Sequence, residues 1–292
     1  MEKLSPIEVS EICNQLGESS PKSIKQVFGG DIHNSWQIEF KNAKFFLKRN
    51  ERKQKFLKFE ESCLKNLQKY INSENLIIPE VVKYIEVNNV ELLVMEWIDM
   101  GNSDQKKLGK GLGEMHIQSN ESNPKSFGYH TQGYIGTTNQ MRGWENNWIE
   151  CFINLRIEPQ LATLENFFSE IEIKNKIKSK IKSELNDYKP FNSLIHGDLW
   201  SGNIGVNNMN KGVIFDPACW WADSEVDIAM TRLFGNFRRE FYENYHKIVP
   251  LKKGFERRTI IYNFYHVLNH ANMFGRSYWN QVEDYIKKIM SM

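Results

Sequence analysis

Apolar residues follow two different periods in the two parts of the chain. Near the amino terminus, Ser5-Pro6-Ile7-Glu8 combines a cap residue, a proline at the first helical position and a glutamate three residues after the cap, and Gly17 closes the segment. Between Ser23 and Arg49, runs rich in β-branched and aromatic residues are separated by Gly29-Gly30 and by Lys41-Asn42. The pattern predicts a short leading helix followed by antiparallel hairpins.

A helix and two further strands complete the predicted amino-terminal part. Gln54 to Tyr70 spaces its apolar residues three and four positions apart, which is typical of a helix with one apolar face. Two strand-like runs, Val81 to Val87 and Glu91 to Trp97, meet at Asn88-Asn89. We therefore expect a small amino-terminal lobe over residues 1–98, with a five-stranded antiparallel sheet and a helix packed on it.

The rest of the chain, residues 99–292, is predicted to be a larger, mainly helical lobe. Helical periodicity occurs over residues 103–118, 144–158, 165–185, 224–234, 256–270 and 278–290. In the lysine-rich stretch from Lys174 to Lys182, Ile173, Ile177 and Ile181 recur every four residues, so we interpret the lysines as a solvated helix face. The predicted fold class is α+β with two lobes.

Length, composition and charge fit a water-soluble protein of this kind. The 292 residues exceed what one simple core usually accommodates, and 40% hydrophobic with 25% charged residues is an ordinary globular balance. The formal net charge of +2 gives no broad electrostatic footprint for nucleic acid or an anionic membrane, and we expect neither as a partner. Met1 to Leu16 lacks a basic segment followed by an apolar one, which predicts a cytoplasmic location.

The strongest chemical signal is a strand, a polar loop and a second strand in the carboxy-terminal part. His196-Gly197-Asp198 is followed by Asn203, and Asp216 follows Val213-Ile214-Phe215. Phosphoryl transfer needs a carboxylate that orients or accepts the proton of the attacking hydroxyl, and oxygen ligands for magnesium on the nucleotide phosphates. The spacing H-G-D-x-x-x-x-N has the shape of a kinase catalytic loop, so we assign Asp198 as the base and Asn203 and Asp216 as magnesium ligands. The alternative is that these are turn and cap residues.

Two upstream residues fall where a kinase needs contacts to the nucleotide ATP. Lys48 ends the third predicted strand, and Glu61 lies on the following helix. This arrangement resembles the strand lysine that contacts nucleotide phosphates and its helix glutamate. Lys44 points to the same strand face and is the fallback, and a surface lysine on a strand edge is the alternative interpretation of Lys48.

Further candidates support this arrangement more weakly. Gly29 and Gly30 would let backbone N–H groups approach phosphates, although a plain hairpin turn explains them equally well. Met95-Glu96-Trp97 ends the last strand of the small lobe, where an adenine ring usually bonds to main-chain groups. We interpret His196 as a brace of the backbone rather than a general base. Asp227 begins a predicted helix, where it either supports the catalytic loop, as in related kinases, or is simply a charge on the helix dipole.

With these residues, the chain resembles the fructosamine kinase (ketosamine-3-kinase) family, whose fold is similar to aminoglycoside phosphotransferases and choline kinases. The most specific stretches are His196 to Asn203, Phe215 to Ala218, Asp227 to Thr231, Leu268-Asn269-His270 and Phe274-Gly275. The resemblance implies a bilobal protein-kinase-like fold and transfer of phosphate from ATP, with Mg²⁺, to the third-carbon hydroxyl of a ketosamine, the rearranged adduct of a sugar on a protein or free amine. The phosphate then becomes a good leaving group, and deglycation follows.

The chain departs from the family's pattern at several positions. Asp31 follows the glycine pair where Ser or Cys is common, and Trp220-Trp221 stands where a Tyr-Tyr pair is typical. Ser224 replaces an arginine, Gln132-Gly133 an Asp-Asn pair, and Asn139 a proline. These departures leave the sugar preference open.

Candidate acceptor contacts follow from the same comparison. They are Trp200 in the catalytic motif and a nearby group of aromatic and acidic residues: Trp220, Trp221, Asp223 and Glu225. The acidic and aromatic side chains of that group can hold a protonated secondary amine, with buried packing as the alternative for the tryptophans. Two other functions stay open: an aminoglycoside- or choline-kinase-like phosphotransferase with another small hydroxyl acceptor, and a catalytically silent nucleotide-binding scaffold.

Overall fold

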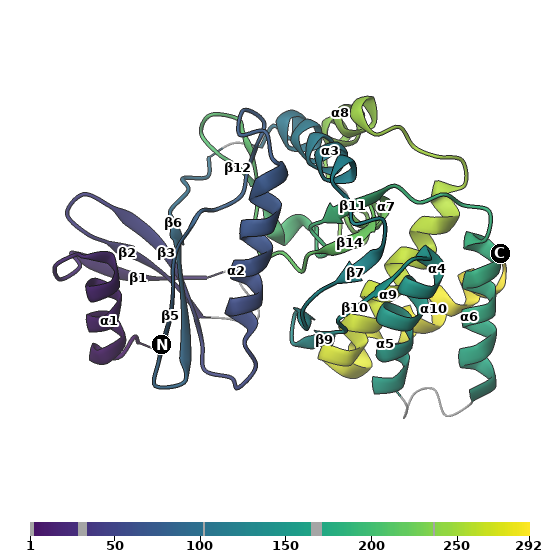
Figure 1. The fold of residues 1–292 in the computed structure, drawn as a ribbon, viewed down its shortest axis with the longest axis horizontal. Helices are drawn as coiled ribbons and strands as arrows, with labels where there is room; N and C mark the ends of the chain where they lie inside the picture. The colour runs from purple at the N-terminus through teal and green to yellow at the C-terminus, as the bar shows by residue number, and fades with distance from the viewer. Residues whose placement is uncertain (1–2, 29–33, 102, 165–170, 236) are drawn as a thin grey trace.

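The amino-terminal part of the chain folds around a five-stranded antiparallel sheet (Figure 1). Its strand order is β1-β2-β3-β6-β5, and the strands are β1 (Ser23–Val27), β2 (Asn34–Glu39), β3 (Lys44–Asn50), β5 (Val81–Val87) and β6 (Val90–Glu96). Asn88 and Asn89 both have positive φ, 51° and 64°, at the tight turn between β5 and β6, a conformation that asparagine tolerates. The five strands predicted from the sequence are confirmed.

The computed structural model describes residues 3–28, 34–101, 103–164, 171–235 and 237–292. Gly29, Gly30 and Asp31, which the sequence singles out as a candidate phosphate loop and a departure from the family, lie outside the described residues.

Two helices cover opposite faces of this sheet. Helix α1 (Pro6–Leu16) begins with the predicted capping box between Ser5 and Glu8 and ends at Gly17, and it lies on the outer face in Figure 1. Helix α2 (Phe56–Leu67), continued by the 3₁₀ turn Gln68–Tyr70, lies on the face toward the rest of the molecule. Alternate residues of β6 serve both faces: Leu92 and Val94 belong to the core under α1, whereas Leu93 and Met95 belong to the core under α2.

A buried carboxylate fixes the start of helix α2. The helix has no side-chain cap of its own at Lys55, and Glu91 of β6 supplies one by accepting hydrogen bonds from the backbone N–H groups of Leu57 (3.3 Å) and Lys58 (3.1 Å). Asn50 Nδ2 (2.6 Å) and Tyr84 Oη (2.7 Å) donate to the same carboxylate. An anion at a helix N-terminus is favourable, and here it sets where α2 begins relative to the sheet.

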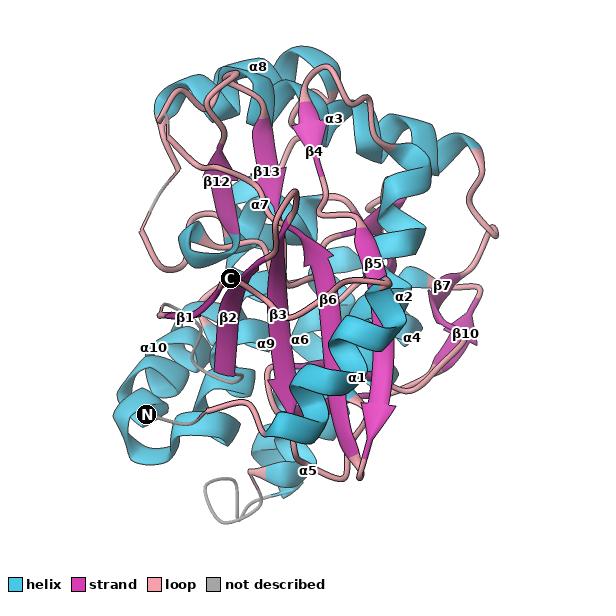
Figure 2. Ribbon diagram, turned by 90° about the vertical axis from the view of Figure 1, so that its left-hand side faces the viewer, coloured by secondary structure: helices cyan, strands magenta, loops and turns pink. Residues whose placement is uncertain are grey.

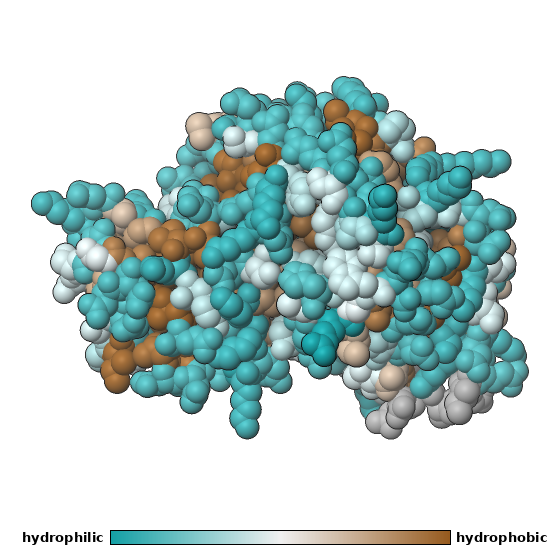
Figure 3. Space-filling model, viewed as in Figure 1, coloured by the Kyte–Doolittle hydropathy of each residue, from teal (hydrophilic) through white to brown (hydrophobic). Residues whose placement is uncertain are grey.

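The carboxy-terminal part is mainly helical, as predicted. Its helices are α3 (Lys106–Glu121), α4 (Trp148–Phe152), α5 (Glu158–Thr163), α6 (Ile171–Leu185), α7 (Glu225–Met230), α8 (Arg239–Ile248), α9 (Phe255–Phe274) and α10 (Trp279–Met290), with a π-helical turn at Ile153–Ile157 and a 3₁₀ turn at Gly275–Tyr278. Helix α8 was not predicted. The single helix predicted over 144–158 is wrong at its start, because Gly143–Glu145 pairs as a strand and the Asn147 side chain caps α4. On α6, Ile177 and Ile181 are buried beneath the lysines, and the surface over this helix is mostly hydrophilic (Figure 3).

Short strands in this part escaped the sequence prediction. One sheet has the order β10-β7-β14-β11 and contains β10 (Gly143–Glu145), β7 (Phe127–Tyr129), β14 (Trp220–Asp223) and β11 (Asn192–Ile195). A hairpin joins β8 (Gly133–Ile135) to β9 (Thr138–Gln140), and a third sheet holds β12 (Ile204–Val206), β13 (Gly212–Ile214) and β4 (Leu76–Ile77). Strand β4 runs parallel to β13 (Figure 2), so a segment before residue 98 is hydrogen-bonded to the larger lobe. The lobe boundary at residue 98 stays a prediction.

Within the described ranges, none of the helices combines the length and apolar character needed to cross a membrane.

The Glu91 cap generates a first prediction. Replacing Glu91 with Gln should lower the free energy of unfolding by about 2 kcal/mol, because a buried carboxylate that accepts several hydrogen bonds is lost. Urea denaturation measures the change. The control is Glu86→Gln on β5, whose side chain is 48% exposed, and which should change the free energy by less than about 0.5 kcal/mol. Equal losses in the two variants would contradict the capping role.

Candidate active site

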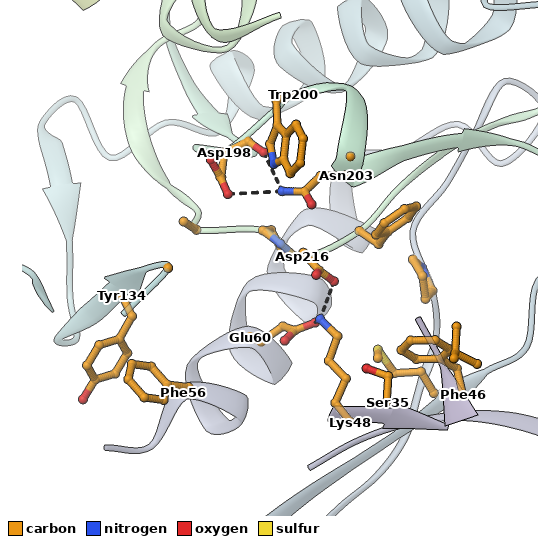
Figure 4. Close-up of a pocket in the computed structure, with 18 of the residues that line it drawn as sticks. Ser35, Phe46, Lys48, Phe56, Glu60, Tyr134, Asp198, Trp200, Asn203 and Asp216 are labelled. Atoms are coloured by element: carbon orange, nitrogen blue, oxygen red, sulfur yellow. Dashed lines mark hydrogen bonds and ion pairs between the residues drawn. The ribbon is translucent and has the colours of Figure 1, made fainter. Parts of the chain in front are cut away.

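A cleft of about 1220 Å³ lies between the two lobes (Figure 4). Strands β2, β3 and β6 and helix α2 contribute one wall, and the segment after β11, the β13–β14 connection and helix α9 contribute the other. A large concave site lined by apolar residues and a few convergent polar groups is the expected form of a ligand site.

Lys48 links the two lobes across the cleft. The side chain is almost fully buried, and Nζ donates to Glu60 Oε1 of helix α2 (2.7 Å) and to Asp216 Oδ1 of the β13–β14 connection. Burial alone would lower the pKa of Lys48, but the Asp216 and Glu60 carboxylates outweigh it and hold the pKa above its ordinary value. The lysine is therefore charged, and its ammonium group faces the Asp216 carboxylate (Figure 4).

The predicted partner of Lys48 on helix α2 is wrong by one residue. Glu61 pairs with Lys58 and Lys65 of its own helix, at 2.7 Å each, whereas Glu60 faces the cleft. One helical residue corresponds to a rotation of about 100°, which separates the two side chains. Apolar residues at 56, 59, 63, 64 and 67 define the buried stripe, and position 60 falls on it at i+4 from Phe56. The periodicity could therefore have selected Glu60.

Asp198, Asn203 and Asp216 come together as the sequence predicts. Asn203 Nδ2 donates to the Asp198 main-chain oxygen (2.9 Å) and to Asp198 Oδ2 (3.2 Å), which leaves the amide oxygen of Asn203 directed toward Asp216 (Figure 4). Asp216 has a left-handed backbone, φ 59°. Burial and the neighbouring Asp216 raise the pKa of Asp198 to about 7. Three oxygen-bearing side chains thus converge opposite Lys48.

Buried hydrogen bonds hold the catalytic loop, residues 196–203, in place. Asp227 accepts from the backbone N–H groups of His196 and Gly197, both at 2.8 Å, and from His116 Nε2 (3.2 Å). His196 Nε2–H donates to the Phe215 carbonyl (2.9 Å), and its Nδ1 accepts from Asp198 N–H (3.3 Å). Burial lowers the pKa of His196, so the ring is neutral with both nitrogens engaged. This geometry supports the bracing roles predicted for His196 and Asp227.

The segment predicted to contact adenine, at the end of β6, lies in the cleft. Met95, Glu96 and Trp97 all line the cleft, and the Trp97 ring lies 6.3 Å from that of Phe46. The Glu96 carboxylate accepts from the backbone N–H of Glu80 (2.9 Å), which ties this segment to the start of β5. The segment is therefore a fixed connection between the lobes.

Trp200 lines the cleft, but the two tryptophans predicted with it as acceptor contacts do not. Among the residues that the structure describes, Trp220 and Trp221 are absent from the cleft lining. Trp220 is fully buried and stacks on Trp148, with ring centroids 5.7 Å apart, and Trp221 packs on Tyr70. Both belong to β14, whose sheet lies behind the catalytic loop, so the alternative of buried packing is correct for them.

The acidic residues predicted as amine ligands form hydrogen bonds with other parts of the protein. Asp223 accepts from Tyr262 Oη (2.6 Å) and from the Phe191 N–H (3.1 Å). Glu225 forms two hydrogen bonds with the Arg258 guanidinium, at 2.6 and 2.9 Å. Neither belongs to the described lining of the cleft, so the predicted contact with a substrate amine is wrong.

The departures from the family pattern that the structure describes also lie away from the cleft lining. Gln132 donates to the carbonyls of Gly133 and Gln140 and so stabilises the β8–β9 hairpin, and a side chain at Gly133 would collide with the Phe59 ring. Asn139 is exposed on β9, and Ser224 is buried. These positions therefore contribute to local packing and hairpin structure.

Sequence reasoning missed an aromatic wall of the cleft. Phe234, His270, Phe274 and Tyr278 form a ring cluster, with centroids of Phe234 and His270 4.5 Å apart and those of His270 and Tyr278 5.1 Å apart. Asn269 lines the same wall, and its Oδ1 accepts from Gln160 Nε2 (3.4 Å). The motifs Leu268-Asn269-His270 and Phe274-Gly275 were the available signal, but their spacing alone does not indicate a cleft.

A two-lobed fold with a buried strand lysine, a helix glutamate and an Asp-Asn-Asp set across one cleft defines the chain as a protein-kinase-like phosphotransferase. The sequence model of the fructosamine kinase family matches residues 7–292, and the chain belongs to this family. It is accordingly a kinase that uses ATP and a hydroxyl acceptor.

Individual relatives agree with this assignment. A protein of Vibrio parahaemolyticus named probable ketoamine kinase is 36% identical over 268 residues, which cover 90% of this chain and 91% of that protein. The chloroplastic protein-ribulosamine 3-kinase of Arabidopsis thaliana is 33% identical over 276 residues, covering 91% and 83%. A crystal structure of a provisionally named fructosamine-3-kinase from Haemophilus somnus has the same fold, with a TM-score of 0.84, 24% identity and coverage of 97% and 96%.

The two adjacent glutamates of α2 provide a matched test of the site. Glu60→Gln should lower kcat/KM for ATP by about tenfold or more, because an active kinase needs the lysine–glutamate ion pair in place. Glu61→Gln should change it by less than about twofold, since that side chain pairs with surface lysines. Steady-state kinetics with varied ATP measure both variants. A larger loss in the Glu61 variant would overturn the assignment of Glu60.

Proposed function

We propose that the chain transfers the terminal phosphoryl group of ATP to the 3-hydroxyl of a ketosamine. Membership of the fructosamine kinase family supports this acceptor, as do the names of relatives that refer to ketoamines and ribulosamines. The observation that carries the proposal is the convergence of Asp198, Asn203 and Asp216 opposite Lys48 in one cleft.

Asp198 is the proposed base. A carboxylate with a pKa of about 7 is half ionised near neutral pH, where a general base is most effective in accepting or orienting the proton of an attacking hydroxyl. Lys48 lies across the cleft and neutralises phosphate charge as the bond to the leaving ADP breaks. The overall step consumes ATP and the hydroxyl and yields ADP, the phosphate ester and one proton.

Asn203 and Asp216 fit the oxygen-ligand chemistry of Mg²⁺. The Asn203 amide oxygen and the Asp216 carboxylate face the same point, and the described residues contain no cluster of three or more His, Cys, Asp or Glu side chains placed to hold a metal. A cation bound through one or two protein oxygens completes its shell with phosphate oxygens and water, as Mg²⁺ does in kinases. Magnesium would then neutralise charge on the transferred phosphoryl group.

The aromatic wall is the proposed acceptor side. A ketosamine carries a secondary amine that is protonated near neutral pH, and aromatic faces attract such a cation. Lys48 is the one Lys or Arg side chain in the described lining, so no lysine or arginine of the described wall would oppose the amine. Once the 3-hydroxyl is phosphorylated and the neighbouring ketone enolises toward the amine-bearing carbon, phosphate departs and the adduct can hydrolyse to release the amine.

Replacement of the proposed base should lower the turnover rate without lowering the stability of the folded state. Asp198→Asn should lower kcat by about a hundredfold or more. The folded state should be as stable or more stable, because the substitution removes a buried negative charge next to Asp216. Coupled ADP-release kinetics and thermal unfolding measure the two effects, and undiminished turnover would refute the role.

A panel of acceptors tests the substrate class. Ribulosamines, erythrulosamines and fructosamines are compared with amino alcohols and aminoglycosides by ADP release, at increasing MgCl₂ after removal of divalent cations. We expect turnover with ketosamines that depends on magnesium. Preference for an aminoglycoside or amino alcohol would favour the alternative phosphotransferase, and ATP binding without turnover of any acceptor would favour the silent scaffold.

A further inference from the structure

Arg156 is a buried cation whose partners are incomplete. It lies on the π-helical turn Ile153–Ile157 and is 1% exposed. Nη1 donates to the carbonyls of Met141 (3.1 Å) and Leu155 (2.8 Å), but Nε and Nη2 have no hydrogen-bond partner among the described residues. No carboxylate of the described chain lies within 4.0 Å of the guanidinium. Within the described part of the chain, the charge is therefore held without a counter-ion.

A buried charge of this kind destabilises the folded state, so its presence calls for an explanation other than stability. An arginine keeps its proton in proteins, and a desolvated charge without a counter-ion destabilises the folded state. Arg258 shows the ordinary solution in the same lobe: it is also buried and stacks on an aromatic ring, at 3.7 Å from Tyr188, but it has a bidentate partner in Glu225. The contrast indicates that Arg156 is retained for a reason other than stability.

The guanidinium of Arg156 lies on the indole of Trp220, 3.9 Å from the ring centroid. Trp220 pairs with Ile195 at the end of β11, immediately before the catalytic loop, and its Cδ1 occupies the space into which a side chain at Gly197 would extend. Gly197 has φ 84°, and a Cβ there would lie 2.2 Å from the Ala218 carbonyl and 3.3 Å from Trp220 Cδ1. The ring on which Arg156 lies is therefore next to the loop backbone that precedes Asp198.

A second path leads from Arg156 to the same place. The Met141 carbonyl that it binds lies in the turn after β9, next to Gln140, and Gln140 Nε2 donates to Tyr265 Oη (3.3 Å). Burial raises the pKa of Tyr265. The positive charge of Arg156 opposes that rise and the negative charge of Asp198 adds to it, so both groups act electrostatically on Tyr265. A π-helical turn that carries a functional residue is a recurrent feature of active sites.

We propose that Arg156 is a positioning residue for phosphoryl transfer, which acts through Trp220 to hold the catalytic loop and Asp198 in their reactive placement. The guanidinium contributes a planar, charged surface that fixes the indole on one side while the loop packs against its edge. This inference rests on the proposed function of Asp198.

The test compares Arg156→Met with Arg258→Met. Methionine keeps most of the volume of the side chain and removes the charge in both variants. For Arg156→Met we expect a Tm within about 2 °C of wild type, because relief of the unpaired charge offsets the lost hydrogen bonds. For Arg258→Met we expect a fall in Tm of about 5 °C or more, because Glu225 is left buried and unpaired.

Kinetics and hydrogen exchange then report on the site. Arg156→Met should lower kcat by about tenfold with KM for ATP within about twofold, while Arg258→Met keeps kcat per folded molecule and Arg156→Lys recovers part of the loss. Backbone hydrogen exchange over residues 194–203 should become faster in Arg156→Met alone. In a double-mutant cycle, the kcat losses of Arg156→Met and Trp220→Phe should be less than additive, since both act on one path.

The outcomes separate this inference from the proposed function. Failure of the wild type to phosphorylate any ketosamine contradicts the proposed function, whereas the exchange and stability measurements need no substrate. The positioning role is overturned if Arg156→Met lowers Tm as much as Arg258→Met does. It is also overturned if exchange over 194–203 is unchanged, or if kcat with the acceptor that the wild type uses stays within about twofold.

Discussion

The buried ammonium of Lys48 is the constraint on which the arrangement of this enzyme depends. It leaves β3 of the small lobe, contacts Glu60 of helix α2, and reaches Asp216 of the large lobe. A buried charge of this kind requires its partners, because without them the Lys48 ammonium would be desolvated and unpaired. The sheet, the helix and the β13–β14 connection are therefore held in one mutual placement. Glu91 contributes to this placement indirectly, because it fixes the start of helix α2, which carries Glu60.

The opposite wall of the cleft is rigid for a different reason. Asp227 accepts two backbone N–H bonds from the catalytic loop, and His196 uses both ring nitrogens to join that loop to the segment before Asp216. Fully satisfied buried networks specify one geometry, because every alternative leaves a polar group without a partner. Asp198 thus faces Lys48 from a loop whose position is set from behind, and its raised pKa follows from the same burial.

The sequence was most informative where chemistry and spacing act locally. Five strands, the α1 cap and the convergence of Asp198, Asn203 and Asp216 could be predicted, because each follows from alternation, a turn or a loop of fixed length. Glu60 was missed because a motif gives a residue's approximate place on a helix but not its rotation, which the apolar stripe sets. Asp223 and Glu225 were misplaced because their partners, Tyr262 and Arg258, come from a distant helix, α9, that no local pattern connects to them. The short strands β7 and β14 are wholly or largely buried and too brief to show a period.

Behind the catalytic loop, polar groups of the described chain that have hydrogen-bond partners and polar groups that lack them occupy different layers. The groups that bond the loop directly, Asp227 and His196, have partners at their hydrogen-bonding atoms. The layer behind them contains atoms without a hydrogen-bond partner among the described residues: Trp220 Nε1, two nitrogens of Arg156, and both ring nitrogens of His266, whose pKa burial lowers to about 3. A core selected for stability alone would replace such groups with apolar residues of similar volume. Arg156 and Trp220 pack against each other next to the strand that leads into the catalytic loop, so the role proposed for Arg156 accounts for polar groups there, while the apolar core around α9 stabilises the lobe.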